Sequence, residues 1–264
     1  MKPKDTTFII SGGVSGLGFE TARQLHDAGA YVLLLDMNAE LGAEVIKTLG
    51  SQRAKFVETD VTETSSIQAA IDAGVDWVKT TGKPFGGIVA AAGVGLPAKL
   101  YNSREKAPAP MAHIDFVLNV NIRGTLDLIR LGLPHLIKNE PFTEDGERGV
   151  LILVSSSAAF DGQPGQVAYS ASKGAIASLT LPLSRDLAMY GIRAVTIAPS
   201  LFESNMTKHM SDRTRKSLER VMEFPRRSGR PEEFAQLVMS SIENPMLNGT
   251  VIRLDGAMRM PSRL

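Results

Sequence analysis

A tyrosine and a lysine lie four residues apart in the stretch Tyr169-Ser170-Ala171-Ser172-Lys173. On a helix this spacing puts both side chains on one face, one turn from each other. A phenol titrates near pH ~10 in model peptides, and a neighbouring ammonium group favours its ionised form and lowers that pKa. The pair could therefore move a proton to or from an alcohol or a carbonyl. Taken alone, such a pair is more often an ordinary feature of a helix surface.

A serine thirteen residues before the tyrosine strengthens the catalytic interpretation. The apolar run Val150-Leu151-Ile152-Leu153-Val154 predicts a buried strand, and Ser156 follows it thirteen residues before Tyr169. Open α/β sheets bind their ligands at the carboxyl ends of the strands. We therefore expect the Ser156 hydroxyl beside Tyr169 and Lys173 as part of one catalytic set.

A glycine-rich turn near the N-terminus predicts a dinucleotide site. Thr7-Phe8-Ile9-Ile10 is typical of a short buried strand, Gly12, Gly16 and Gly18 follow, and a helical pattern then continues through Ala28. Glycines at these places allow a tight turn and let the backbone approach a pyrophosphate at the helix N-terminus. A flexible loop is the alternative, but the strand before the turn and the helix after it favour a dinucleotide.

An acidic residue ends the second predicted strand, Tyr31-Val32-Leu33-Leu34-Leu35. Asp36 lies 18 residues after Gly18, where a carboxylate can bind the ribose hydroxyls of NAD and repel the additional phosphate of NADP. Met37 follows it, and Ser15 rather than a basic residue precedes Gly16. The alternative is a solvated carboxylate in a turn.

Three further places are candidates for the same site. Asp60 could accept a hydrogen bond from the adenine amino group, cap the predicted helix 63–80, or do both. The small residues Ala92 and Gly93 end the fourth strand, where they suit either a cofactor or tight helix packing. Asn121 lies inside a long predicted helix, 112–137, where asparagine is a poor helix former and is plausible as a buried hydrogen-bonding group.

The order of elements predicts the fold. Strands alternate with helices along the whole chain, which indicates a doubly wound, Rossmann-type parallel sheet with helices on both faces. We expect one domain over residues 1–264, with a lid at about 201–224 that carries Phe202, Met206 and Met210. An ordinary pair of surface helices is the alternative for that segment. The connection 95–111 contains no predicted element, and connections of this length are usually functional or disordered.

Composition excludes several classes of function. A net charge of +1 gives no basic field for nucleic acid. The absence of cysteine excludes disulfides and a thiol nucleophile and suits a reducing, cytoplasmic location, and the four histidines show no metal-ligand spacing, so we expect no metal site. No apolar run approaches the ~18 residues of a membrane span, and the N-terminus leaves no room for a signal peptide, so no membrane association is expected.

Together these residues resemble the short-chain dehydrogenase/reductase family over essentially the whole chain. The glycine turn, Asp60, the end of the fourth strand, Asn121, Ser156, Tyr169 and Lys173 follow the family's order and spacing. Within the family, the stretches 158–163, 169–174, 197–199 and 243–257 are most similar to the NAD-dependent branch that acts on 3-hydroxyacyl-CoA esters.

The resemblance implies a role for each matching residue. Tyr169 would be the general acid/base, Ser156 would bind the substrate oxygen, and Lys173 would lower the phenol pKa and bind the nicotinamide ribose. Asn121 would hold a water that connects Lys173 to solvent, and Ser204 would bond the carboxamide. The implied contacts to NAD are Gly12, Ser15, Gly16, Leu17, Gly18, Asp36, Asp60, Val61, Ala92, Gly93, Tyr169, Lys173, Pro199 and Ser204.

Two positions depart from the family pattern. Ala90 stands where the family usually has asparagine, which would loosen hydrogen bonding in the central sheet. Ser200 replaces a glycine after Pro199, which would shift the backbone beside the nicotinamide. Neither change removes a catalytic group.

The resemblance also sets the functional expectations. The chain is expected to be an oxidoreductase for a 3-hydroxyacyl-CoA, with a hydroxysteroid or another secondary alcohol as the alternative substrate. A nucleotide-binding scaffold without turnover is disfavoured, because it has no need for the complete catalytic set. A homotetramer is expected from the family and from the apolar last strand, 250–254, which leaves a sheet edge to be covered.

Overall fold

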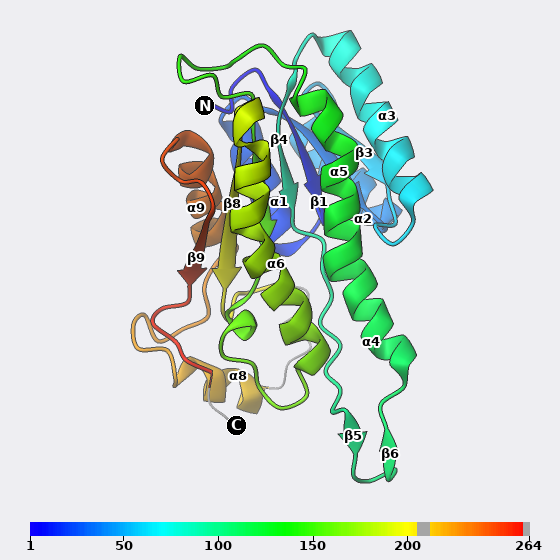
Figure 1. The fold of residues 1–264 in the computed structure, drawn as a ribbon, viewed down its shortest axis with the longest axis vertical. Helices are drawn as coiled ribbons and strands as arrows, with labels where there is room; N and C mark the ends of the chain where they lie inside the picture. Colours follow the sequence, from blue (N-terminus) through cyan, green and yellow to red (C-terminus); the bar gives the residue numbers. More distant parts are fainter. Residues whose placement is uncertain (205–211, 261–264) are drawn as a thin grey trace.

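A seven-stranded parallel sheet forms the centre of the protein, as seen in the computed structural model of Figure 1. The structure describes residues 1–204 and 212–260, and the predicted lid residues Met206 and Met210 lie outside them. The strand order is β3-β2-β1-β4-β7-β8-β9. The strands are β1 (Thr7–Ser11), β2 (Tyr31–Asp36), β3 (Ala54–Glu58), β4 (Phe85–Ala90), β7 (Gly149–Val154), β8 (Ile192–Pro199) and β9 (Thr250–Leu254). The predicted doubly wound fold is confirmed.

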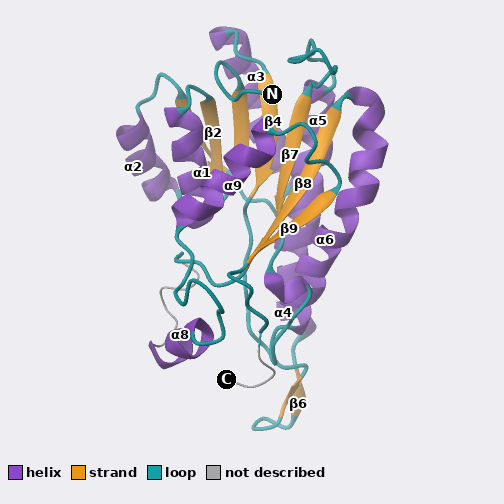
Figure 2. Cartoon of the chain, turned by 90° about the vertical axis from the view of Figure 1, so that its left-hand side faces the viewer, coloured by secondary structure: helices purple, strands orange, loops and turns teal. Residues whose placement is uncertain are grey.

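Helices cover both faces of this sheet (Figure 2). One face carries α1 (Gly16–Asp27), α2 (Ala39–Leu49) and α9 (Pro231–Glu243), and the other carries α3 (Thr64–Thr81), α5 (Thr125–Leu136) and α6 (Val167–Leu187). Strand side chains alternate between the two cores, since Ile10 packs with the first group of helices and Ile9 with the second. Near-continuous apolar strands are therefore the natural sequence signature of this sheet.

Two features depart from the elements predicted from the sequence. The connection 95–111 contains a small antiparallel hairpin, β5 (Tyr101–Asn102) and β6 (Ala107–Pro108), which projects from the end of the molecule in Figure 1. The long predicted helix 112–137 is α4 (Met111–Leu118) and α5 joined by a π-helical segment, Asn119–Gly124. Short 3-10 turns at Ser157–Ala159 and Ala188–Tyr190 and helix α8 (Asp212–Glu219) complete the described elements.

The sheet reverses its winding between β1 and β4, because chain connections run outward in opposite directions from these neighbours. Such a switch point opens a crevice at the carboxyl ends of the two strands, which is where ligands bind in this class of fold. Within residues 1–204 and 212–260, no helix is both long and apolar enough to cross a membrane.

Candidate active site

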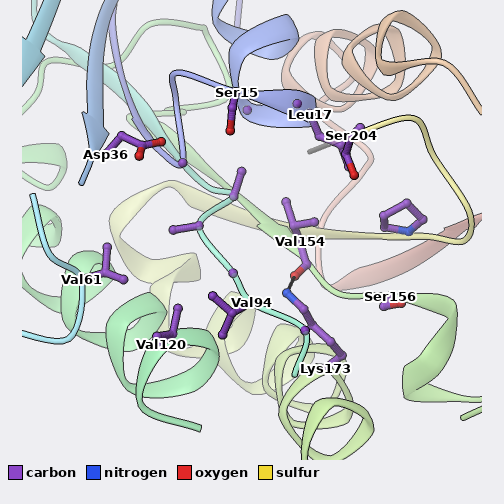
Figure 3. A pocket seen from close by; sticks show the side chains of 18 of the residues that line it. Ser15, Leu17, Asp36, Val61, Val94, Val120, Val154, Ser156, Lys173 and Ser204 are labelled. Carbon is purple, nitrogen blue, oxygen red and sulfur yellow. Dashed lines mark hydrogen bonds between the residues drawn. The ribbon is translucent and has the colours of Figure 1, made fainter. Parts of the chain in front are cut away.

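A pocket of about 530 Å³ occupies this crevice. Figure 3 shows it as an elongated space, with Asp36 and Val61 on one side and Ser156 and Lys173 on the other. All of the predicted site residues except Asn121 and Asp60 line it, namely Gly12, Ser15, Gly16, Leu17, Gly18, Asp36, Val61, Ala92, Gly93, Ser156, Tyr169, Lys173, Pro199 and Ser204. The sequence motifs, far apart in the chain, therefore meet in one place.

The glycine turn is a cradle that only glycine can build. A Cβ added at Gly18 would lie 2.1 Å from the carbonyl oxygen of Gly12, and one at Gly12 would lie 3.0 Å from the backbone of Ala92. Gly12 and Gly16 also have positive φ angles, of 65° and 53°, which favour glycine. Ser15 then precedes helix α1, whose first amides have no partner within the helix. This surface fits the pyrophosphate of a dinucleotide.

Asp36 lies at the carboxyl end of β2, on the rim of the pocket. Its Oδ1 accepts a hydrogen bond from the Asn38 amide at 3.2 Å, and its carbonyl accepts from the Thr59 amide at 2.9 Å. These bonds fix the backbone on both sides of the carboxylate. The position suits two ribose hydroxyls and opposes a phosphate.

Asp60 has a different environment from the one expected. Its Oδ1 accepts from the amide and the hydroxyl of Thr62, at 2.8 and 2.7 Å, and the carboxylate does not line the pocket. Helix α3 begins at Thr64 with Glu63 as its N-cap, so the prediction that Asp60 caps this helix is wrong. A carboxylate side chain so close to the backbone forms a local turn instead. Its neighbours Thr59 and Val61 are the residues that face the pocket.

The predicted catalytic groups lie together in the pocket, with Ser156 and Lys173 buried and Tyr169 half-buried. The Tyr169 phenol and the Ser156 hydroxyl are close enough to interact, and the Ser156 Oγ accepts from the Ala158 amide at 3.1 Å. The Lys173 Nζ donates to the Val154 carbonyl at 2.9 Å, as drawn in Figure 3, and lies 5.9 Å from the centre of the Tyr169 ring. Thus the strand β7 and the helix α6 bring all three together.

Burial changes the acidity of both Tyr169 and Lys173. Burial raises the pKa of the Tyr169 phenol, and the hydrogen bond with Ser156 opposes that rise without cancelling it. Burial also lowers the pKa of Lys173 to about 8. The sequence predicted that Lys173 would lower the phenol pKa, but in the protein alone desolvation outweighs any such effect. Tyr169 is therefore held protonated, ready to donate.

Asn121 is a clamp between two elements that border the pocket. Its side-chain amide donates to the Val94 carbonyl and the Ser172 hydroxyl, both at 2.9 Å, and its Oδ1 accepts from the Val94 amide at 2.8 Å. The π-helical segment turns this side chain inward, where it is 1% exposed. A Cβ on Gly93 would lie 3.2 Å from both Asn121 Oδ1 and Lys173 Nζ. The side chain thus ties the end of β4 to α6.

Some residues of the site were missed by sequence reasoning. The Ser155 hydroxyl donates to the Lys173 carbonyl at 2.7 Å, and the Ser172 hydroxyl donates to the Tyr169 carbonyl at 2.7 Å. Both hold the catalytic helix in place. Their proximity to Ser156 and Lys173 in the chain was the available signal, but serine is too common near turns for that signal to distinguish them.

The two departures from the family pattern have visible consequences. Ala90 pairs in register with Ser11 on one side and Leu153 on the other, so the backbone ladder is intact at this position. The Ser200 hydroxyl is buried and has no hydrogen-bond partner among the described residues, while its amide donates to the Leu254 carbonyl at 3.1 Å. Strand β8 therefore stays joined to the end of β9 at this point.

Comparison with known proteins gives this site its family. A family model described as short chain dehydrogenase matches residues 6–215. The chain belongs to the short-chain dehydrogenase family. The predicted resemblance is thereby confirmed, and the protein is an oxidoreductase of the kind that uses a nicotinamide dinucleotide.

Relatives within the family cover nearly the entire chain. The chain is 42% identical over 260 residues to 3-hydroxyacyl-CoA dehydrogenase type-2 of Drosophila melanogaster, covering 97% of this chain and 98% of the relative. It is 43% identical to the Homo sapiens protein of the same name, covering 97% and 96%. A crystal structure of 3-hydroxyacyl-CoA dehydrogenase type-2 from Mycobacterium avium superposes with a TM-score of 0.89 at 35% identity, covering 98% and 97%. The similarity thus includes both the cofactor side and the substrate side of the pocket.

Proposed function

We propose that the protein transfers a hydride between NAD and the 3-hydroxyl or 3-keto group of an acyl-CoA. The observation that carries this proposal is the similarity, along almost the whole chain, to relatives named 3-hydroxyacyl-CoA dehydrogenase type-2. The relatives match on the elements that enclose the substrate as well as on the glycine turn.

The described side chains are suited to the proton half of this reaction. The bound nicotinamide cofactor would accept a hydride from the carbon that bears the oxygen, or donate a hydride to it. The Tyr169 phenol would give its proton to that oxygen in reduction and take it back in oxidation. Ser156, next to the phenol in the pocket, would hold the same oxygen in line. Lys173, beside them in the pocket, would hold the ribose and hold positive charge close to the phenol.

NAD rather than NADP is favoured by the charge at the adenosine end of the pocket. Asp36 supplies a carboxylate there, and Lys173, on the opposite side, is the basic residue among those lining the described pocket. A 2′-phosphate would face the carboxylate without a cation to balance it. Comparison of kcat/KM for the two cofactors tests this, and equal values would contradict it.

A handle for CoA is available beside the substrate mouth. The connection 95–111 carries Lys99, Arg104 and Lys106, all exposed, on and around the β5–β6 hairpin. Its base is held to the catalytic loop, because the Ala98 amide donates to the Gly165 carbonyl at 2.8 Å. Positive side chains at this place could meet the anionic phosphates of CoA.

The decisive experiment compares acetoacetyl-CoA with free acetoacetate and with a panel of ketosteroids, each reduced with NADH. A much higher kcat/KM for the CoA ester supports the proposal. If the ester is no better than free acetoacetate, or if a ketosteroid or simple ketone is preferred, the substrate is another secondary alcohol. Replacing Lys99, Arg104 and Lys106 by alanine should raise KM for the ester alone. Replacing the exposed Lys47 and Lys138 is the matched control.

A homotetramer is part of the proposal. Exposed apolar side chains gather along α4 and the start of α5, with Met111, Phe116 and Leu126 exposed by 62%, 48% and 42%, and every residue of the edge strand β9 is partly exposed. Such surface is commonly covered by a partner. Light scattering that gives the 28.4 kDa mass of one chain would contradict a tetramer. The cytoplasmic location stays a prediction that cell fractionation can test.

A further inference from the structure

Arg253, near the end of β9, bonds several residues outside the catalytic group Ser156, Tyr169 and Lys173. Its Nη2 donates to Asp161 Oδ2 at 2.5 Å and to the Met258 carbonyl at 3.1 Å, and its Nε donates to Asp255 Oδ2 at 2.6 Å. Its guanidinium lies 5.2 Å from the centre of the Phe160 ring. A planar guanidinium presents five donors in a rigid fork, so it can hold several partners in fixed directions, whereas a lysine offers three donors on a flexible stem.

The first of these partners belongs to the loop that connects the catalytic serine to the catalytic tyrosine. Asp161 and Phe160 lie in residues 157–166, between Ser156 and Tyr169. Phe160 is 52% exposed, so its ring is held by the Arg253 contact rather than by a core. This loop connects the two residues that are proposed to act on the substrate oxygen.

The other partners belong to the C-terminal turn that supports helix α8. The Gly256 carbonyl accepts from the amides of Glu223 and Phe224, at 3.1 and 3.3 Å. Met258 is fully buried in a small cluster with Leu201, Leu218 and Met222. Since Arg253 bonds both Asp255 and the Met258 carbonyl, it fixes the turn on which this part of the proposed lid rests.

We infer that Arg253 is a positioning residue that sets the two walls of the substrate mouth relative to each other. One wall is the loop 157–166, and the other is the end of α8 with the C-terminal turn. The inference rests on the proposed function only for the identity of the substrate, an acyl-CoA. The dinucleotide contacts Gly12 to Gly18 and Asp36 follow β1 and β2, on the far side of the sheet centre from β9, and Arg253 does not itself line the described pocket.

Kinetics of three single variants test this assignment. Arg253→Met removes the charge and keeps an extended apolar side chain, and Asp161→Asn removes the charge of the loop partner, which reduces the ion pair to a weaker neutral hydrogen bond. Both should raise KM for acetoacetyl-CoA about 10-fold while kcat changes less than about 3-fold, the pattern of lost substrate positioning. The Kd for NADH, from its fluorescence, should stay unchanged. Arg259→Met is the control, because Arg259 also pairs with Asp255, at 3.1 Å, but is 63% exposed.

A double variant and a second measurement complete the test. Arg253→Met with Asp161→Asn should behave like Arg253→Met alone, because both changes act on the same bond. Hydrogen exchange of the NADH-bound protein should quicken in residues 157–166 and 219–224 of Arg253→Met. This readout needs no substrate, so it separates the inference from the proposed function if the CoA ester is not turned over. Unchanged exchange and KM in Arg253→Met, or an equal weakening of NADH binding, would overturn the inference.

Discussion

Two cationic side chains are buried at opposite ends of the same sheet, and they differ in whether a carboxylate pairs with them. Arg193 lies near the amino end of β8 and is 7% exposed, while Lys173 lies at the carboxyl ends of the strands and is 5% exposed. Arg193 bonds the Glu147 carboxylate at 2.7–2.8 Å and also the carbonyls of Ser241, Ile242, Asn244 and Leu247. Lys173 bonds one carbonyl, and no carboxylate of the described residues pairs with it.

The difference separates structural from functional use of a buried charge. A buried ion pair with every donor satisfied costs little once formed, but it is strongly destabilising to break. An unpaired ammonium costs free energy in the folded protein, and its lowered pKa of about 8 is the sign of that cost. A fold keeps such a group where it has a use. The amino end of the sheet therefore supplies stability, and the carboxyl end holds the chemistry.

Removing Arg193, the cation that is paired with a carboxylate, should have the largest effect on the free energy of unfolding. Arg193→Met leaves the buried Glu147 carboxylate with the Met1 ammonium, 2.7 Å away, as its remaining cation, and several carbonyls lose their donor. We expect about 3–5 kcal/mol less stability to urea, the usual cost of removing one member of a buried pair. The variant Glu147→Gln, which keeps a polar group of similar shape, should cost less. A loss below about 1 kcal/mol in Arg193→Met, the value of an exposed pair, would contradict the comparison.

Removing the Tyr169 hydroxyl, at the carboxyl end of the sheet, should lower turnover without changing the free energy of unfolding. Tyr169→Phe keeps the ring and deletes the proton, so kcat should fall by a factor of order 10² or more while NADH still binds. Its urea midpoint should stay near that of the unchanged protein, because the ring is kept and the lost hydroxyl interacts mainly with Ser156 among the described residues. Steady-state kinetics and denaturation measure the two effects separately. Activity within a few-fold of the unchanged protein would remove Tyr169 from its role.

The features of the fold and the site that depend on local sequence patterns could be predicted from the sequence. Apolar runs placed the seven strands, and the glycine spacing and the Tyr169-to-Lys173 spacing brought most of the pocket residues together. These signals work because strand burial and the geometry of a tight turn are local properties of the chain.

What the sequence missed depends on tertiary surroundings. Asn121 was expected in an α-helix, but it lies in a π-helical segment, and its side chain bonds Val94 and Ser172, which are far from it in the chain. The rise in the Tyr169 pKa results from burial, which no spacing reveals. The bond between Arg253 and Asp161 joins residues 92 positions apart. Each is a property of how the elements pack and not of any one element.

Lys173→Met tests the comparison between the two cations, because it should raise the free energy of unfolding whereas Arg193→Met should lower it. The folded protein lowers the lysine pKa from 10.5 to about 8, so at neutral pH it carries an ammonium that the unfolded chain solvates better. Without cofactor, the variant should therefore be more stable at pH 7 by about 2 kcal/mol, within the limit of about 3 kcal/mol that a shift of this size sets.

The sign of the pH dependence tests the cause. Between the folded pKa near 8 and the unfolded value of 10.5, the unfolded chain binds more protons, so the stability of the unchanged protein rises with pH. The advantage of Lys173→Met should be full below pH 8 and shrink as the pH rises above it. Urea denaturation at pH 7 and pH 9.5 measures this, with Lys138→Met, an exposed lysine, as the control. A variant less stable than the unchanged protein at pH 7, or an advantage that does not shrink, would mean that Lys173 is a structural cation like Arg193.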